Sequence, residues 1–315
     1  MTDVLVAGET LIDFLPDRPG SLEAVDGFHK RPGGAPANVA VGLSRLGHPP
    51  AFWTRLSTDP FGSYLAAVLA DAAIPDRFVE RDPTAKTTLA FVSHDEAGER
   101  DFSFYRDGTA DTRFDVGRVP DTALENRSWV HAGGVTLASG RSRAATLDLL
   151  ERAGDSTTVS FDPNVRRELW PSLETMREVV CEALAYVDVC KGTREEFELL
   201  GFEGDTDRAL AETVCETGVD LVFLTRGAAG ALAVGSDGSP WSDVADHPGY
   251  AVDVVDTTGA GDAFVTGTID ALSTGQSLQE TVAFANAVAA AATTEHGAMA
   301  SLPDREQVRA IQAGQ

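Results

Sequence analysis

Short apolar runs alternate with longer segments of helical spacing along most of the chain. Val4–Ala7, Leu221–Thr225 and Ala231–Val234 are apolar at almost every position, which is typical of strands covered on both faces. Asn38–Leu46 and Leu173–Ala185 instead repeat apolar residues every three or four positions, which predicts amphipathic helices. This alternation predicts an α/β fold on a parallel sheet with right-handed crossovers. Further strands are expected at Ala51–Leu56, Trp129–Ala132, Thr158–Phe161 and Val187–Cys190, and further helices at Phe61–Ala73, Arg141–Ala153, Arg194–Leu200, Asp207–Thr217, Ala260–Ser273 and Leu278–Thr294.

One stretch interrupts the alternation. Thr87–His94 and Arg100–Tyr105 have the composition of two strands, and the turn signal at residues 95–98 joins them. Phe102 and Phe104 lie two residues apart, which indicates one covered face. We therefore expect a hairpin that forms a lid or subdomain. The length of 315 residues fits either two domains or one large α/β domain with a small appendage.

The charge balance is strongly acidic. There are 49 acidic residues against 25 Lys and Arg, which gives a net charge of −24. Three of the 25 are lysines (Lys30, Lys86 and Lys191), which leaves 22 arginines. Such a surface repels nucleic acids and anionic membranes, so neither is an expected partner. The excess of acidic residues, together with few lysines, favours adaptation to a salt-rich cytoplasm. The alternative is an acidic composition that reflects no such adaptation.

Cysteine spacing and hydropathy bear on whether the protein is secreted, binds zinc or spans a membrane. The three cysteines have no paired spacing, which argues against a disulfide framework and against a zinc site. No stretch approaches the roughly 18 uninterrupted apolar residues of a membrane helix. We therefore expect a cytoplasmic protein.

The strongest local motif is the stretch Asp256–Asp262, which reads Asp-Thr-Thr-Gly-Ala-Gly-Asp. A Gly-Ala-Gly turn that leads into a helix leaves backbone N–H groups free for an anion, and the helix N-terminus adds positive potential. Asp262 would then lie beside a bound phosphoryl group and accept a proton from an attacking hydroxyl. The alternative is a glycine turn with a helix-capping acid. The Gly-x-x-x-x-Gly-Lys pattern of a Walker A loop does not occur.

Two motifs together carry a resemblance to a known family. The stretch 256–264 resembles the second signature of the ribokinase/PfkB carbohydrate-kinase family, and Pro32–Ala40, which reads Pro-Gly-Gly-Ala-Pro-Ala-Asn-Val-Ala, resembles the first. The resemblance covers essentially the whole chain. It implies one kinase domain over residues 1–315, with a doubly wound, mostly parallel sheet flanked by helices. It also implies a small β lid from about residues 11–33 and 84–114, through which two copies pair in many members.

The resemblance also implies roles for individual residues in phosphoryl transfer and sugar binding. Asp262 would be the general base, and the backbone of Gly259, Ala260 and Gly261 would stabilise the transferred phosphoryl group. Arg166, in an Asp-x-Asn-x-Arg motif after a strand, would bridge the substrate and the phosphate with its planar guanidinium. The candidate sugar-binding residues are Asp13, Gly33, Gly34, Asn38, Tyr105, Arg106, Asp162 and Asn164. Each also has a purely structural alternative. Asp13 would be a solvated acid at a strand end, and the Gly33–Asn38 stretch a loop that caps a helix. The Asp162–Arg166 stretch would be a surface turn with an ion pair, and the hairpin with Tyr105 and Arg106 would only dimerise.

The nucleotide and the ions have their own candidates. Glu196 would hold Mg²⁺ through water, because this ion keeps much of its hydration. Thr193 stands where many members of the family have asparagine, so its role is open. The candidate ATP-binding residues are Lys191, Thr193, Thr225, Gly227, Gly230 and Asn286, and the residues that would enclose a K⁺ ion are Asp256, Thr258, Gly297 and Ser301.

The expected function is therefore Mg·ATP-dependent phosphorylation of a sugar hydroxyl. Fructose is the expected acceptor, and 2-keto-3-deoxygluconate is the alternative, because Tyr105 and Arg106 suit either sugar. Ribose and nucleosides are less favoured, given Thr193 and the motif that ends at Arg166. A dinucleotide-dependent oxidoreductase would need Gly-x-Gly-x-x-Gly after the first strand, where Gly8-Glu9-Thr10 stands. A catalytically inactive sugar sensor would have lost Asp262, which is present.

Overall fold

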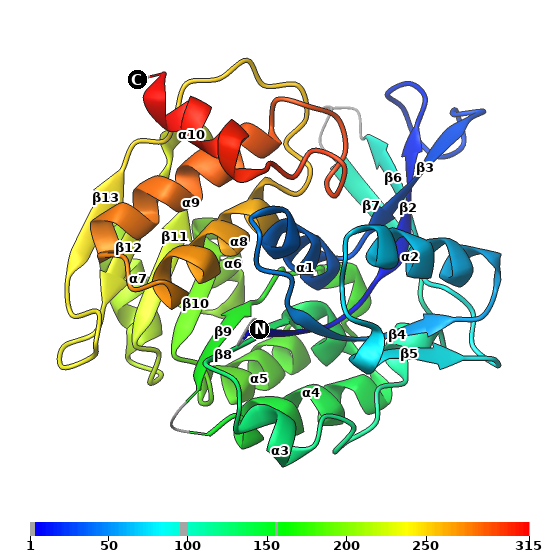
Figure 1. The fold of residues 1–315 in the computed structure, drawn as a ribbon, viewed down its shortest axis with the longest axis horizontal. Coiled ribbons are helices and arrows are strands. Elements are labelled where there is room, and N and C mark those ends of the chain that lie inside the picture. Colours follow the sequence, from blue (N-terminus) through cyan, green and yellow to red (C-terminus); the bar gives the residue numbers. More distant parts are fainter. Residues whose placement is uncertain (1–3, 95–99, 155–156, 315) are drawn as a thin grey trace.

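The computed structural model describes residues 4–94, 100–154 and 157–314, so the turn predicted at residues 95–98 lies outside the described residues. The strands form two sheets, and the helices follow the predicted alternation (Figure 1). The larger sheet contains β1 (Val4–Ala7), β4 (Ala51–Ser57), β5 (Val79–Asp82), β8 (Trp129–Gly133), β9 (Thr158–Asp162), β10 (Val189–Thr193), β11 (Leu221–Thr225), β12 (Ala231–Gly235) and β13 (Val244–His247). The smaller sheet contains β2 (Leu11–Pro16), β3 (Phe28–Gly33), β6 (Leu89–His94) and β7 (Arg100–Tyr105). The helices are α1 (Ala35–Arg45), α2 (Pro60–Asp71), α3 (Asp121–Leu124), α4 (Gly140–Arg152), α5 (Leu173–Leu184), α6 (Arg194–Leu200), α7 (Asp207–Cys215), α8 (Ala260–Ser273), α9 (Leu278–Ala292) and α10 (Arg305–Ala313).

The larger sheet has the strand order β13-β12-β11-β10-β9-β8-β1-β4-β5. All neighbours from β11 to β5 are parallel, as predicted, whereas β12 and β13 are antiparallel additions at one edge. The chain winds outward from β1 to β5 on one side, then continues from β8 to β13 on the other. Such a reversal leaves a crevice at the carboxyl ends of the strands, where ligands bind in open α/β sheets.

The larger sheet separates two hydrophobic cores. Val4 and Val6 of β1 point into one core, whereas Leu5 and Ala7 point into the other, because successive strand residues face opposite sides. Helices α1, α2, α8, α9 and α10 cover the first face, and α4, α5, α6 and α7 cover the second (Figure 1). Burying a side chain such as Leu5 stabilises the fold by about 1.5–3 kcal/mol. Double coverage explains why β1 is apolar throughout.

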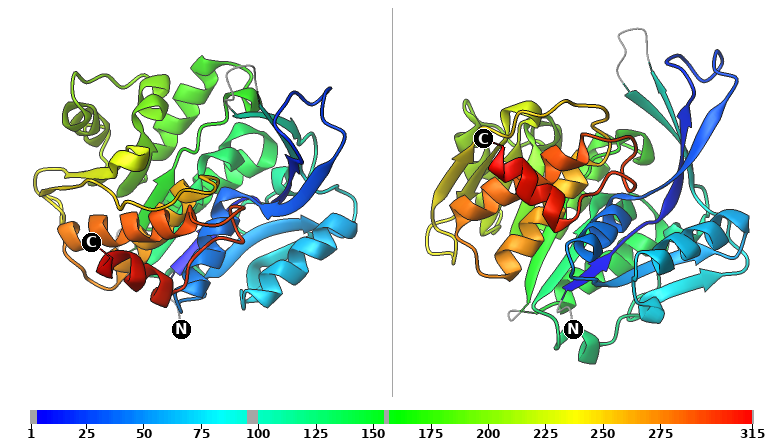
Figure 2. Two further views of the ribbon diagram at one scale, coloured as in Figure 1. Left: turned by 90° about the horizontal axis from the view of Figure 1, so that it is seen from above. Right: turned by 45° about the horizontal axis from the view of Figure 1, so that its top comes forward.

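The smaller sheet has the order β3-β2-β6-β7 and projects from one end of the molecule (Figure 2). The predicted hairpin is confirmed as β6 and β7, and β2 pairs in parallel with β6. Aromatic residues hold this sheet together: the rings of Phe14 and Phe91 stack at 4.8 Å, and Phe14 also meets Phe61 of α2 edge-on. Residues 11–33 therefore join the hairpin in one sheet, in the region expected to form a lid.

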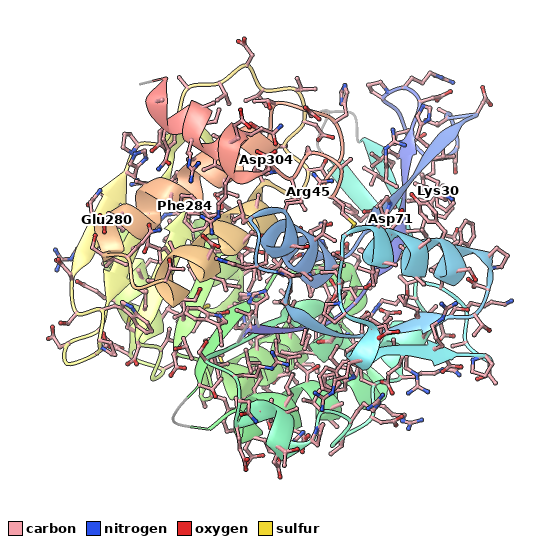
Figure 3. The ribbon with its side chains drawn as sticks, in the orientation of Figure 1. Lys30, Arg45, Asp71, Glu280, Phe284 and Asp304 are labelled. Atoms are coloured by element: carbon pink, nitrogen blue, oxygen red, sulfur yellow. The ribbon has the colours of Figure 1, made fainter. Side chains whose placement is uncertain are left out.

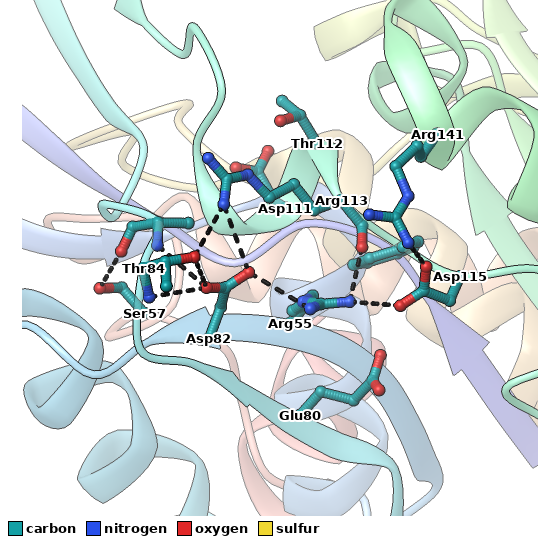
Figure 4. Close-up of polar contacts among 12 residues, drawn as sticks. Arg55, Ser57, Glu80, Asp82, Thr84, Asp111, Thr112, Arg113, Asp115 and Arg141 are labelled. Carbon is teal, nitrogen blue, oxygen red and sulfur yellow. Dashed lines mark hydrogen bonds and ion pairs between the residues drawn. The ribbon is translucent and has the colours of Figure 1, made fainter.

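A polar cluster fastens the two ends of the β6–β7 hairpin to the larger sheet (Figure 4). Asp82 ends β5 and lies 3.2 Å from Arg55 of β4. Arg55 in turn lies 2.7 Å from Asp115, in the segment that follows β7. Burial opposes ionisation of Asp82, but hydrogen bonds from Thr84 and Ala85 and the charge of Arg55 lower its pKa to about 2. The segments before β6 and after β7 are thus held at one point.

Within the described ranges, the structure contains no helix that is long and apolar enough to span a membrane.

Candidate active site

The turn before α8 is built for close approach by a ligand. Gly259 adopts a left-handed conformation with φ of 79°, which favours glycine. A Cβ there would lie 2.8 Å from Cα of Ala298, so a larger residue would clash with backbone. No described side chain caps this helix, so N–H groups of its first turn can bind an anion, while that of Ala260 donates to the Thr257 carbonyl at 3.2 Å. The predicted phosphoryl-binding geometry is consistent with this turn at Gly259, Ala260 and Gly261.

Asp262 lies in the first turn of α8 and is buried. Its Oδ2 accepts a 2.7 Å hydrogen bond from Nδ2 of Asn38 on α1, so the two sequence motifs meet in space. Burial raises the pKa of Asp262 to about 6, although the hydrogen bond from Asn38 opposes this rise. A carboxylate with a pKa close to neutrality is suited to accept and release a proton. The Oδ1 atom of Asn38 is buried and has no partner among the described residues.

Asp13 and the two glycines of the first motif are neighbours. Asp13 lies on β2, and Gly33 ends the paired strand β3. A Cβ on Gly33 would lie 2.0 Å from Oδ2 of Asp13, so a larger residue would push this carboxylate out of its position. Gly34 is the N-cap of α1 with φ of 107°. Burial raises the pKa of Asp13 to about 7, the charge of Arg166 lowers it and that of Asp262 raises it, so these three predicted residues share one electrostatic site.

Arg166 connects this site to the smaller sheet. It follows β9, and its guanidinium lies 5.3 Å from the centre of the Phe102 ring on β7. Its positive charge acts on both Asp13 and Asp262. Tyr105, at the end of β7, is 64% exposed. The structure therefore brings Arg166 to the predicted centre and leaves Tyr105 at the surface of the smaller sheet.

Asp162 and Lys191 form a buried ion pair. Oδ2 of Asp162 lies 2.9 Å from Nζ of Lys191, and Oδ1 accepts a 2.9 Å hydrogen bond from the backbone of Asn164. Burial opposes the charge on Lys191, but Asp162 and Glu196 raise its pKa above the usual value. Each carboxylate oxygen of Asp162 thus has one partner within the protein, and its contact with a sugar stays a prediction. Asn164 is buried as well and has φ of 39°.

Arg106 differs from its predicted position above the sugar. Its side chain is buried beneath the smaller sheet, where Nε donates a 2.7 Å hydrogen bond to Asp111 and Nη1 donates one to Ser139. Its Nη2 atom is buried without a partner in the described part of the chain. A buried guanidinium needs a counter-ion, and Asp111 supplies one, so Arg106 is held away from the surface.

The prediction from sequence missed Glu9. This residue follows β1 and is 1% exposed. Its Oε1 accepts a 3.1 Å hydrogen bond from the backbone of Ala35 at the start of α1, whereas Oε2 is buried and unpaired among described residues. Burial raises its pKa to about 8, and the nearby charge of Arg106 opposes this. An acid directly after a parallel strand was the available signal, since strand ends face the ligand crevice.

Thr193 and Glu196 form a capping box at the start of α6. The Thr193 hydroxyl accepts a 3.2 Å hydrogen bond from N of Glu196, and Oε2 of Glu196 accepts one of 3.0 Å from N of Thr193. Oε1 of Glu196 accepts a third from Val165, directly before Arg166. Thr193 therefore has a structural role as the N-cap of α6. The Thr-x-x-Glu spacing was a visible signal.

The predicted nucleotide residues lie around the ends of β11 and β12. Thr225 donates a 3.4 Å hydrogen bond to the Gly192 carbonyl on β10, and Gly227 has φ of 57° with open space beside it. Gly230 packs tightly, because a Cβ there would lie 1.9 Å from the His247 carbonyl oxygen. Asn286 is buried within α9, where its amide donates a 2.8 Å hydrogen bond to the Val282 carbonyl, and its contact with ATP stays a prediction.

The two segments expected to enclose K⁺ do meet. Asp256 accepts hydrogen bonds from N of Thr258 at 2.9 Å and from N of Gly297 at 3.0 Å. Ser301 donates to the Gly297 carbonyl. Arg45 of α1 donates a 2.9 Å hydrogen bond to the Ala300 carbonyl, and Figure 3 shows Arg45 close to the start of α10. Among the described residues, no three His, Cys, Asp or Glu side chains gather as a metal site.

A buried base beside an anion-binding turn is what phosphoryl transfer to a hydroxyl requires, and the fold and the site together define a phosphotransferase with an alcohol group as acceptor. The pfkB family carbohydrate kinase model matches residues 1–305, and the chain belongs to this family.

Named relatives agree with this assignment. Fructokinase-1 from Zea mays is 37% identical over 315 residues, which cover 97% of this chain and 96% of the relative. The crystal structure of a fructokinase with bound ATP from Xylella fastidiosa superposes with a TM-score of 0.86 at 32% identity and covers 100% of this chain and 99% of that one. A fructokinase from Vibrio cholerae O395, in a fructose, ADP and calcium ion bound form, gives a TM-score of 0.85 at 32% identity, with 99% of each chain covered.

Proposed function

We propose that this protein transfers the γ-phosphoryl group of Mg·ATP to a hydroxyl of fructose, giving fructose 6-phosphate. The observation that carries the proposal is the 2.7 Å hydrogen bond from Asn38 to Asp262 at the start of α8, because it joins the two motifs that resemble the family's signatures. The Vibrio cholerae relative that binds fructose and ADP supports the choice of substrates.

The mechanism follows from the positions of a few groups. Asp262 accepts the proton of the attacking hydroxyl, which Asp13 and the unpaired Oδ1 of Asn38 would orient by accepting hydrogen bonds. The backbone N–H groups of the Gly259–Gly261 turn, together with Arg166, stabilise charge on the transferred phosphoryl group. Glu196 retains lone pairs beyond its two backbone bonds, so it would hold Mg²⁺ through water, and that ion neutralises charge on the phosphates when bound.

A neutral sugar suits this site better than an acidic one. Recognition of 2-keto-3-deoxygluconate would require a free cation for its carboxylate, and Arg106 was the candidate. That guanidinium is paired with Asp111 at 2.7 Å with both side chains buried, and its one unpaired nitrogen, Nη2, is buried too. A polyol accepts and donates hydrogen bonds without bringing a charge, which supports fructose over the keto acid.

The smaller sheet serves as a lid in this proposal. Phe102 of β7 contacts the guanidinium of Arg166, so movement of the sheet and placement of a phosphate-binding residue are coupled. Closure would exclude water, which otherwise competes with the sugar for the phosphoryl group. Pairing of two copies through this sheet stays a prediction. K⁺ would lie between the Asp256–Thr258 and Gly297–Ser301 segments, and exchange of KCl for NaCl at constant ionic strength tests its contribution to turnover.

The test is Asp262→Asn, assayed in molar KCl with Mg·ATP and fructose, 2-keto-3-deoxygluconate or ribose. Removal of the base should lower kcat by about 10²–10⁴ without loss of folded protein. Asp237→Asn makes the same change at an exposed turn and should keep wild-type activity. Wild-type turnover in Asp262→Asn would contradict the mechanism, and a wild-type preference for another sugar of the panel would contradict the choice of acceptor.

A further inference from the structure

Lys191 is unusual for this chain. Only three lysines occur beside 22 arginines, and Lys30 and Lys86 are both exposed, whereas Lys191 is 8% exposed. Burial of an ammonium group is unfavourable unless it is paired. Asp162 provides that pair at 2.9 Å. A buried ion pair is weak evidence for a gain in stability, so this one calls for another explanation.

The position of the ammonium group suggests that explanation. A Cβ on Gly261 would lie 3.1 Å from Nζ and 3.8 Å from Cε of Lys191. The lysine therefore lies directly behind the turn that would bind the phosphoryl group. Asp162 lies on β9, where it accepts hydrogen bonds from the ammonium of Lys191 and from the backbone of Asn164. The compact ammonium also suits this narrow space better than a planar guanidinium would.

We propose that Lys191 is a positioning residue for phosphoryl transfer: through the Gly259–Gly261 turn it applies a fixed positive charge to the transferred phosphoryl group and to Asp262, while Asp162 keeps the lysine charged. The inference rests on the proposed kinase function. Lys191 gives up no proton and contacts no reacting atom. Its charge is preorganised, so no reorganisation is needed as negative charge develops on the phosphoryl oxygens.

The surroundings of Asp262 determine what the loss of Lys191 would do. The charged groups that act on Asp262 and its neighbourhood are Asp13 of β2, Asp162 of β9, Arg166 after β9 and Lys191 of β10. Without Lys191, two carboxylates would face Asp262 with Arg166 as the remaining cation. The pKa of Asp262 should rise, and the acidic limb of the rate profile should move to higher pH.

The experiment compares Lys191→Met, the double variant Lys191→Met with Asp162→Asn, and Lys86→Met as a matched exposed control. For each, kcat and KM for fructose and ATP are measured from pH 5 to 9. Calorimetry then measures the affinity for aluminium fluoride, a mimic of the transferred phosphoryl group, in the presence of fructose and MgADP. We expect Lys191→Met to lower kcat about ten- to a hundredfold, to leave KM for fructose within about twofold, and to weaken aluminium fluoride binding.

The double variant separates an electrostatic role from a structural one. It removes both charges, so the melting temperature and the acidic limb should return toward wild-type values, because the carboxylate that raised the pKa of Asp262 is gone too. Aluminium fluoride affinity should stay weak. A double variant with wild-type kcat, or unchanged aluminium fluoride affinity in both variants, would overturn the inference. If Lys191→Met alone does not fold, the neutral double variant carries the test.

The outcome also differs from a failure of the proposed function. A wild-type enzyme that turns over another sugar of the panel would overturn the choice of fructose, and the Lys191 comparison would then be made with that sugar. Wild-type behaviour of Lys86→Met shows that loss of a single positive charge elsewhere does not produce the effect.

Discussion

The hydrogen bond from Asn38 to Asp262 predicts a shift in the pH dependence of catalysis. Asn38→Ala removes the 2.7 Å donor to a buried carboxylate. A hydrogen bond to a charged group contributes about 1.5–3 kcal/mol, and one pKa unit corresponds to about 1.4 kcal/mol. The pKa of Asp262, now about 6, should therefore rise by about one to two units.

The assay is kcat/KM for fructose between pH 5 and 9 at saturating Mg·ATP. Asp262 must be ionised to accept a proton, so its protonation alone should lower the wild-type rate below about pH 6, to about a tenth near pH 5. In Asn38→Ala the fall should begin between about pH 7 and 8. Protonation alone then lowers the rate at pH 7 by about two- to tenfold, and this loss should be recovered at pH 9.

The shape of the pH profile separates an effect on the pKa of Asp262 from the loss of a contact between Asn38 and the sugar, because the lost contact would lower the rate equally at every pH. Asn126→Ala removes an exposed asparagine whose amide donates to the Thr122 carbonyl, and it should reproduce the wild-type profile. If Asn38→Ala loses the same factor at pH 6 and pH 9, with an unmoved limb, then Asn38 does not set the charge state of Asp262.

Three further substitutions probe other parts of the site. Burial raises the pKa of Glu9 from 4.5 to about 8. Between these two pH values the unfolded state has already lost this proton, so the free energy of unfolding falls as pH rises, by at most about 5 kcal/mol. Glu9→Gln should raise the melting temperature at pH 9 and leave it nearly unchanged at pH 4.5, and an equal shift at both would refute the assignment. Gly259→Ala should lower kcat at least about tenfold and reduce the free energy of unfolding by about 1–3 kcal/mol, because the new Cβ would lie 2.8 Å from Ala298; denaturant unfolding and steady-state rates check both. Arg166→Lys keeps the charge but loses the planar fork, so kcat should fall about tenfold or more with the acidic limb unmoved, and wild-type kcat would show that charge alone suffices.

The sequence predicts the doubly covered part of the fold well. Arg194–Leu200 and Ala260–Ser273 begin and end as predicted, because capping and glycine signals mark their ends. Val79–Asp82 and Val244–His247 were missed, since these edge strands carry few apolar residues and show no period. The antiparallel direction of β12 also could not be predicted, because its apolar run looks the same as that of a buried parallel strand.

The site was only partly predictable for a different reason. Motif resemblance predicted that Asn38 and Asp262 belong to one site, and the two side chains are hydrogen-bonded. It could not show which polar atoms find their partners inside the protein. Asp162 and Arg106 match the sequence pattern of sugar-binding residues, yet their strongest contacts are Lys191 and Asp111. Such pairings depend on distances between elements far apart in the chain.

The path of the chain divides the proposed sugar-binding site between the smaller sheet and the helices that cover the larger sheet. Asp13 and Gly33 belong to the smaller sheet, whereas Asn38 and Asp262 belong to helices that cover the larger one. Strands β2 and β3 leave after β1 and return directly at α1. In the proposed mechanism, substitutions around Asp13 should therefore change which sugar is bound, while Asp262 and the Gly259–Gly261 turn keep their positions. With this arrangement, the preference for a sugar can change during evolution while the catalytic base and the phosphoryl-binding turn are kept.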